Sequence, residues 1–322
     1  MTGAGTQGPE RFDVIVVGEA LVEISARNGF HDPQDVRLAF SGDALNAAAA
    51  AVRAGAEPVA LLTRTGDDVL GRGILRACEA HGVETTLARR VSKPNGAYFV
   101  VADPNGSLEF VYLREGSAAS TLNPEDVDID EVRSARALLV TGVTAAISAS
   151  SAGAVDRASR LVSEAGGIVV YDPNFRRKLT TSESARRMLA TVAPRATLVT
   201  PSCPGDSVPL LGTDDPQEVA RCCRDLGAGA VAVTLGADGV LLDQGGSTTH
   251  LPGFTAPRVV DATGAGDVLT GVVTARLALG DELTEAIRLG MAAATLSVGH
   301  QGGAGDVPSL EEINTFLEAE AV

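Results

Sequence analysis

The chain has 322 residues, 45% of them apolar, and a formal net charge of −15. This length accommodates one large α/β domain or two smaller ones, and the acidic charge argues against nucleic acid or an anionic membrane as a partner, since either needs a basic face. No stretch approaches the roughly 20 uninterrupted apolar residues of a membrane span, and residues 1–11 lack the features of a signal peptide. We therefore expect a disordered tail over residues 1–11 and a cytoplasmic protein.

The four cysteines have the spacing of neither a zinc site nor a disulfide framework. They are Cys78, Cys203, Cys222 and Cys223, and we expect them to be small core residues. None of the four histidines has metal-ligand spacing.

Short apolar runs rich in β-branched residues alternate with helix-like segments along almost the whole chain. The strand candidates are residues 14–17, 59–63, 137–141, 168–171, 197–200 and 231–235. The helix candidates are residues 43–54, 69–81, 151–165, 182–193, 216–226, 266–279 and 283–299. This rhythm predicts one α/β domain over residues 12–322, with helices on both faces of a mainly parallel sheet.

One stretch breaks the alternation. Residues 98–103 and 107–114 have the two-residue period of strands and flank a turn-forming Pro-Asn-Gly, which predicts a β-hairpin. Phe110, Tyr112 and Arg114 are spaced by two and therefore share one face. The pattern fits a hairpin that covers a polar ligand, or a plain surface hairpin.

Three segments near the carboxyl ends of predicted strands are candidate site elements, because ligands of open parallel sheets bind there. Residues 41–46 open an alanine-rich helix, with Ser41 as a candidate N-cap and Gly42 allowing close approach of a ligand. Residues 172–176 follow a strand, and Arg176 has the planar fork that grips a carboxylate or phosphate. Residues 234–239 fit either a ligand loop or a simple β-turn.

Residues 261–267 read Asp-Ala-Thr-Gly-Ala-Gly-Asp, between a strand-like segment at 258–260 and a helix that starts near Ala265. The glycines and the unpaired N–H groups of the helix start favour a bound phosphate. Asp267 suits this position if it takes a proton from the attacking group, which predicts phosphoryl transfer; ordinary capping is the structural alternative. The dinucleotide fingerprint and the P-loop fit poorly, because position 269 is Leu and no Lys follows.

This signature resembles that of the ribokinase-like (PfkB-type) carbohydrate kinases, and the three segments resemble parts of the same family, in the family's order, from about residue 13 to 308. The resemblance implies a three-layer αβα sandwich with a small β lid formed by segments near 19–40 and 92–116. It also implies a kinase that uses ATP and Mg²⁺, with a monovalent cation such as K⁺ as a further candidate, and a homodimer formed through the lid.

Within the family, the closest resemblance is to the 2-keto-3-deoxygluconate kinases. It implies that the sugar acid is surrounded by Gly42, Asp43, Asn46, Tyr98, Tyr112, Arg114 and Arg176. It implies that Gly264, Ala265 and Gly266 hold the transferred phosphate and that Asp267 is the base. The nucleotide would lie along Asn174, Thr234, Gly236, Asp238 and Gly239, and Asp206 would serve the metal.

The chain departs from the family in two places. The Asn-x-x-Glu element would fall at residues 203–206, where Asn is absent and Asp206 replaces Glu, and residues 291–294 lack the Asn often found beside adenine. Two alternatives stay open. The first is a fructokinase, a ribokinase or another ketose or nucleoside kinase. The second is a non-catalytic sugar or nucleotide sensor, against which Asp267 argues because a pure binder needs no base.

Overall fold

The computed structural model describes residues 11–26, 30, 34–102, 108–300 and 307–320. The predicted tail, apart from Arg11, lies outside the described residues, as do the Pro-Asn-Gly turn of the hairpin and parts of the lid segment at 19–40. Within the described residues, no helix is both long and apolar enough to cross a membrane.

The main sheet has nine strands in the order β13-β12-β11-β10-β9-β8-β1-β4-β5. In chain order these are β1 (Val14–Val17), β4 (Val59–Gly66), β5 (Ala88–Val91), β8 (Ala137–Thr141), β9 (Ile168–Asp172), β10 (Leu198–Val199), β11 (Ala230–Thr234), β12 (Val240–Gln244) and β13 (Ser247–Leu251). The pairs β11–β12 and β12–β13 are antiparallel and the other six pairs are parallel, so the predicted mainly parallel sheet is confirmed.

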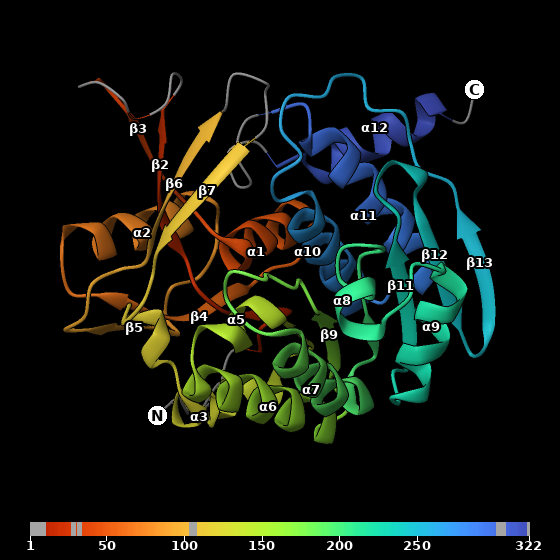
Figure 1. The fold of residues 1–322 in the computed structure, drawn as a ribbon, viewed down its shortest axis with the longest axis horizontal. Coiled ribbons are helices and arrows are strands. Elements are labelled where there is room, and N and C mark those ends of the chain that lie inside the picture. The colour runs from red at the N-terminus through yellow and green to blue at the C-terminus, as the bar shows by residue number, and fades with distance from the viewer. Residues whose placement is uncertain (1–10, 27–29, 31–33, 103–107, 301–306, 321–322) are drawn as a thin grey trace, which may run out of the picture.

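Helices cover both faces of this sheet, as Figure 1 shows. The long ones are α1 (Asp43–Arg53), α2 (Val69–Ala80), α6 (Ala149–Glu164), α7 (Ser182–Val192), α9 (Pro216–Asp225), α10 (Ala265–Ala278), α11 (Leu283–Ser297) and α12 (Leu310–Glu320). The shorter ones are α3 (Pro124–Val127), α4 (Asp130–Ser134), α5 (Gly142–Ile147) and α8 (Ser207–Leu211). The predicted helices are confirmed to within two residues at each end.

Strand β1 shows how the period of two builds two cores. Val14 and Val16 face one hydrophobic cluster, which includes the inner sides of α1, α10 and α11. Ile15 and Val17 face the other, which includes the inner sides of α6, α7 and α9. Alternate side chains of a strand point to opposite faces, so a strand buried on both sides is apolar throughout. The result is the expected three-layer αβα arrangement.

A second sheet has four strands in the order β3-β2-β6-β7, and we call it the lid sheet. Its strands are β2 (Leu21–Ala26), β3 (Arg37–Ser41), β6 (Ala97–Ala102) and β7 (Leu108–Leu113). Strands β6 and β7 pair antiparallel, which confirms the predicted hairpin. In Figure 1 the lid sheet stands beside α1 and above the main sheet.

The strand predicted at residues 258–260 is wrong. Val259 and Val260 are exposed and lie in an irregular segment, held by a hydrogen bond from the Val260 N–H to the Val298 carbonyl oxygen at 2.7 Å. Two apolar residues form a β-strand only if a neighbouring strand supplies backbone hydrogen-bond partners, and none lies beside them among the described residues. Of the four cysteines, all are free, and Cys78 and Cys223 are buried as expected while Cys203 and Cys222 are partly exposed.

Candidate active site

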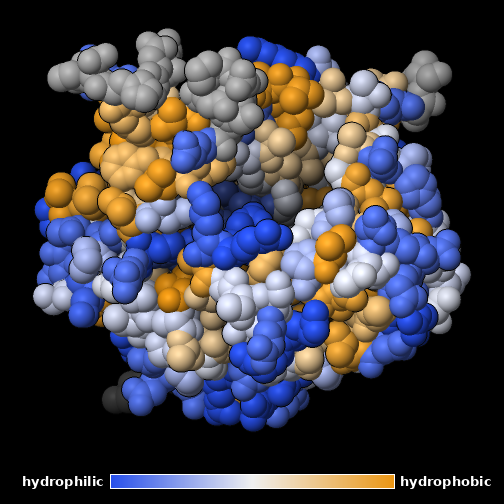
Figure 2. Space-filling view, viewed as in Figure 1, coloured by the Kyte–Doolittle hydropathy of each residue, from blue (hydrophilic) through white to orange (hydrophobic). Residues whose placement is uncertain are grey.

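A cavity of about 1190 Å³ lies between the lid sheet and the carboxyl ends of the central strands. Figure 2 shows it as a hollow near the middle of the face, with hydrophilic residues at its rim. It brings together most of the predicted site residues: Gly42, Asp43, Asn46, Tyr98, Tyr112, Arg114, Asn174, Arg176, Asp206, Thr234, Gly264, Gly266 and Asp267. Ala265, Gly236, Asp238 and Gly239 do not line it.

The start of α10 forms an open cradle of backbone N–H groups. Its N-cap is Gly264, which has a left-handed φ of 82° and offers no side chain to cap the helix. A Cβ added to Gly266 would meet no atom within 4 Å, so the space beside the first turn of α10 is open. Unpaired helix N–H groups beside open space suit a phosphate.

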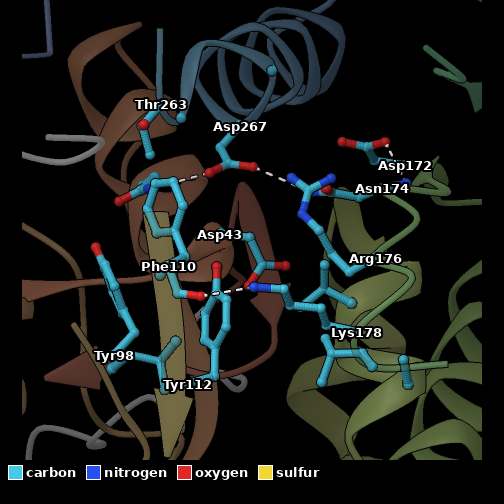
Figure 3. A pocket seen from close by; sticks show the side chains of 18 of the residues that line it. Asp43, Tyr98, Phe110, Tyr112, Asp172, Asn174, Arg176, Lys178, Thr263 and Asp267 are labelled. Carbon is cyan, nitrogen blue, oxygen red and sulfur yellow. Dashed lines mark hydrogen bonds between the residues drawn. The ribbon is translucent and has the colours of Figure 1, made fainter. Parts of the chain in front are cut away.

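The carboxylate of Asp267 lies in this first turn and is held by two amides (Figure 3). The side-chain NH₂ of Asn46 donates to Oδ2 at 2.9 Å, and that of Asn174 donates to Oδ1 at 3.3 Å. The Asn46 amide is fixed in turn by Ser41, whose hydroxyl donates to its oxygen at 3.1 Å. Ser41 is therefore not the N-cap that the sequence predicted: Gly42 occupies that position, without a side-chain bond, and Ser41 ends β3.

The environment of Asp267 raises its pKa to about 6. Burial is the main cause, and the nearby negative charge of Asp43 adds to it. The Asn46 amide, the Arg176 guanidinium and the Asn174 amide oppose the shift. A carboxylate with such a pKa is ionised near neutral pH and is a better proton acceptor than an ordinary aspartate.

Two further carboxylates lie near Asp267. The Thr141 hydroxyl donates to Oδ2 of Asp43 at 2.6 Å, which fixes it at the start of α1. Asp172, at the end of β9, accepts the backbone N–H of Asn174 at 3.0 Å, and this bond accompanies the left-handed φ of 38° at Asn174. Burial raises the pKa of Asp172, and the charges of Asp206 and Asp267 raise it further.

The lid contributes an aromatic wall. The rings of Tyr98, Phe110 and Tyr112 lie with their centroids 5.7 to 6.3 Å apart, and the Arg114 guanidinium lies 5.5 Å from the Tyr112 ring centre. The predicted common face of Phe110, Tyr112 and Arg114 is confirmed.

Arg114 has a partner within the protein that sequence reasoning missed. Its Nη2 lies 2.6 Å from Oε2 of Glu19, and both side chains are buried. Burial raises the pKa of Glu19, and Arg114 opposes the shift. The charge of Arg114 is thereby compensated. The signal available in the sequence was an acidic residue two positions after the apolar run Val14–Val17.

Arg176 contrasts with Arg114. It donates to the Phe175 carbonyl oxygen at 3.2 Å and forms no ion pair with any described residue. In Figure 3 it extends into the pocket beside Asn174, below Asp267. Lys178, two residues after Arg176, reaches across the pocket and donates to the Phe110 carbonyl oxygen of the lid at 3.0 Å.

Asp206 is engaged with backbone and hydroxyl donors. Oδ1 accepts the Phe175 N–H at 2.6 Å, and Oδ2 accepts the N–H and the hydroxyl of Ser202, each at 2.7 Å. Close by in sequence, the Thr200 hydroxyl is buried, lines the same pocket and has no hydrogen-bond partner among the described residues. The described residues contain no cluster of three His, Cys, Asp or Glu side chains suited to a metal. One carboxylate and one hydroxyl fit Mg²⁺, which is usually held by few protein ligands together with water and substrate phosphates.

Residues 234–239 connect two antiparallel strands. Thr234 ends β11, and Gly236–Asp238 form a short 3₁₀ turn before β12. The simple-turn interpretation therefore describes the backbone of this segment. Its predicted contact with the nucleotide stays a prediction.

Comparisons with known proteins agree with this geometry. Residues 11–310 match the family described as pfkB family carbohydrate kinase. A 2-dehydro-3-deoxygluconokinase of Thermoproteus tenax is 32% identical, over 98% of this chain and 99% of that protein. A second 2-dehydro-3-deoxygluconokinase, of Bacillus subtilis, is 28% identical, over 96% and 97%. A crystal structure of a candidate Ribokinase II of E. coli with ATP and Mg²⁺ superposes with a TM-score of 0.86 at 25% identity, covering 95% of this chain and 99% of that one.

Proposed function

The chain belongs to the pfkB family of carbohydrate kinases, and we propose that it transfers the γ-phosphate of ATP to a hydroxyl of the sugar acid 2-keto-3-deoxygluconate. This compound is the 2-dehydro-3-deoxygluconate in the names of the two relatives. The observation that carries the substrate proposal is Arg176, a cation in the pocket without an ion-pair partner among the described residues, beside the predicted base.

Asp267 acts as the base in this proposal. The sugar hydroxyl attacks the γ-phosphorus in line, and the carboxylate orients that hydroxyl and accepts its proton as the O–P bond forms. Asn46 and Asn174 restrict the rotation of the carboxylate, since each holds one of its oxygens. The carboxylate oxygens keep lone pairs for the sugar hydroxyl.

The N–H groups of residues 264–267 neutralise charge on the transferred phosphoryl group. They lie at the start of α10, whose dipole also favours a negative charge, beside the open space at Gly266. The Ala265 N–H also donates to the Ala262 carbonyl oxygen at 3.3 Å. Bound Mg²⁺ supplies charge neutralisation between the phosphates. Asp206 and Thr200 are the residues that would hold it, directly or through water. Asn174, Thr234, Gly236, Asp238 and Gly239 remain the proposed nucleotide side.

The carboxylate of the sugar acid is assigned to Arg176. Arg114 is paired with Glu19, so it contributes a neutralised guanidinium and a surface for Tyr112. Asp43 and Asp267 would repel a carboxylate placed near them. The sugar therefore lies with its carboxylate toward Arg176, its reacting hydroxyl toward Asp267, and its remaining face against the aromatic wall of Tyr98 and Tyr112. At the start of α1, Gly42 has a φ of 129°, and a Cβ there would lie 2.7 Å from the Glu19 carbonyl oxygen, so this glycine allows close approach of the backbone before β2 rather than of the sugar.

A coupled assay of ADP release across sugars and sugar acids tests the substrate. We expect the highest kcat/KM with 2-keto-3-deoxygluconate and a loss of at least tenfold with fructose or ribose, since a charged hydrogen bond contributes about 1.5–3 kcal/mol. A neutral ketose or a nucleoside preferred over every sugar acid would instead support the alternative kinase. Repeating the assay in Na⁺ and in K⁺ tests the monovalent cation.

The lid sheet supports the proposal of a homodimer. Leu38, Val111 and Leu113 are each about half exposed or more and lie on the face of the lid sheet opposite Tyr98. Figure 2 shows hydrophobic surface in this region. Apolar patches of this kind mark contact surfaces. We expect light scattering to give twice 32.8 kDa for the wild type and a monomer for Leu113→Glu, with Val208→Glu on α8 as the control. A monomeric wild type would contradict the proposal. We also place the protein in the cytoplasm, where ATP is available.

A further inference from the structure

Glu23 is a buried carboxylate with no part in the phosphoryl-transfer chemistry. It is 4% exposed and lies on β2, between β3 and β6 of the lid sheet. Its Oε1 is 3.4 Å from Nη1 of Arg37, and its Oε2 accepts a short hydrogen bond from the Tyr98 hydroxyl. A buried carboxylate is costly unless it is paired, so these two partners explain how the lid tolerates it.

The strand register places Glu23 beside a pocket residue, on the same face of the lid sheet. Glu23 is adjacent to Tyr98 on β6, and Tyr98 is opposite Tyr112 on β7, so the three side chains form one row across the sheet. Tyr98 lines the cavity and stands on its lid side in Figure 3. Glu23 does not line the cavity. Any influence that it has on the ligand therefore passes through Tyr98.

The single hydrogen of the Tyr98 hydroxyl decides where this group donates and where it accepts a hydrogen bond. A tyrosine hydroxyl has one hydrogen, and Tyr98 donates it to Oε2 of Glu23. Ser41 is placed to donate to the Tyr98 oxygen, which lowers the pKa of Tyr98, and its hydroxyl also lies 3.1 Å from the Asn46 amide oxygen that it can donate to. Burial, followed by the charge of Glu23, raises the pKa of Tyr98, so the hydroxyl stays protonated. Because its one hydrogen is given to Glu23, the Tyr98 oxygen can act toward any further group only as an acceptor.

We infer that Glu23 is a positioning residue that fixes Tyr98 as a hydrogen-bond acceptor, so that this wall of the pocket selects a hydroxyl of the sugar and rejects a carboxylate or carbonyl at that place. Two facing acceptors repel, which is how a site discriminates against the wrong group. The inference rests on the proposed sugar site and adds the orientation of the bound sugar within it. Hydroxyls of the acceptor lie toward Tyr98, and its carboxylate lies toward Arg176, across the pocket.

A double-mutant cycle tests this role. The variants are Tyr98→Phe, Glu23→Gln and the double variant, and Arg37→Gln is the matched control, because it removes the other partner of Glu23 without touching Tyr98. The measurements are KM and kcat for whichever sugar the wild type phosphorylates best, with ATP affinity and Tm as checks of folding. Choosing the sugar in this way separates the test from the identity of the substrate.

We expect Tyr98→Phe and Glu23→Gln each to raise KM for the sugar by about tenfold, the loss of one good hydrogen bond, with kcat within about twofold. The glutamine amide can donate to the Tyr98 oxygen and occupy its lone pair. The double variant should be no worse than Tyr98→Phe alone, and Arg37→Gln should keep the wild-type KM. A wild-type KM for Glu23→Gln, or multiplicative losses in the double variant, would overturn the inference. If the wild type itself does not phosphorylate the sugar acid, the proposed substrate is refuted instead.

Discussion

The raised pKa of Asp267 leads to a quantitative prediction about pH. A base must be deprotonated to accept a proton, so activity should be present above the pKa of this carboxyl and should be lost as pH falls through it. With a pKa of about 6, kcat/KM should fall about tenfold between pH 7 and pH 5, because the ionised fraction falls by that factor. With the ordinary value of 3.8, kcat/KM would barely change over this range.

Two variants test the physical cause of the shift. Asp43→Asn removes a neighbouring negative charge and should move the acid limb to lower pH. Asn46→Ala removes a donor to the carboxylate and should move the limb to higher pH. The assay is kcat/KM from pH 4.5 to 8 with sugar well below saturation and excess Mg²⁺, so that ATP stays in its magnesium complex. An acid limb near pH 4, or equal midpoints in all three proteins, would refute the reasoning.

The remaining predictions concern the two substrates. Arg176→Ala should raise KM for 2-keto-3-deoxygluconate at least tenfold while changing KM for ATP little, because it removes the charged partner of the substrate carboxylate. Arg187→Ala, at an exposed position on α7, is the control. An unchanged KM for the sugar acid in Arg176→Ala would contradict the assignment of Arg176 to the carboxylate. Gly266→Ala should fold normally, because its Cβ would meet no protein atom within 4 Å, yet it should weaken ATP binding by filling the cradle. An unchanged KM for ATP in Gly266→Ala would contradict the role of the cradle in binding phosphate.

The parts of the fold that depend on local pattern were predictable. The continuous apolar run of Val14–Val17 and the amphipathic spacing of helices such as α6 and α9 specify buried faces whatever their partners are. The hairpin was equally visible, because residues 98–103 and 107–114 have a period of two. The exposed Val259 was misread, since an apolar residue in a short segment says nothing about whether a neighbouring strand exists.

The contacts that tune the site could not be predicted. The bond from Asn46 to Asp267 joins residues 221 positions apart, and the pair of Glu19 with Arg114 joins the main sheet to the lid. The motif indicated residues that line the cavity, but not that Asn46 donates a hydrogen bond to Asp267 or that Arg114 pairs with Glu19. Such pairings follow from how α1, α10 and the lid sheet pack, which no local pattern encodes.

The central claim is that Asp267 accepts the proton of the sugar hydroxyl at the open start of α10. Its most direct test is the rate of ADP formation by Asp267→Asn at saturating ATP and sugar, together with the affinity for ATP. We expect kcat to fall by about 10²-fold or more while ATP binding and Tm are retained. A variant with near wild-type kcat would contradict the assignment of Asp267 as the base.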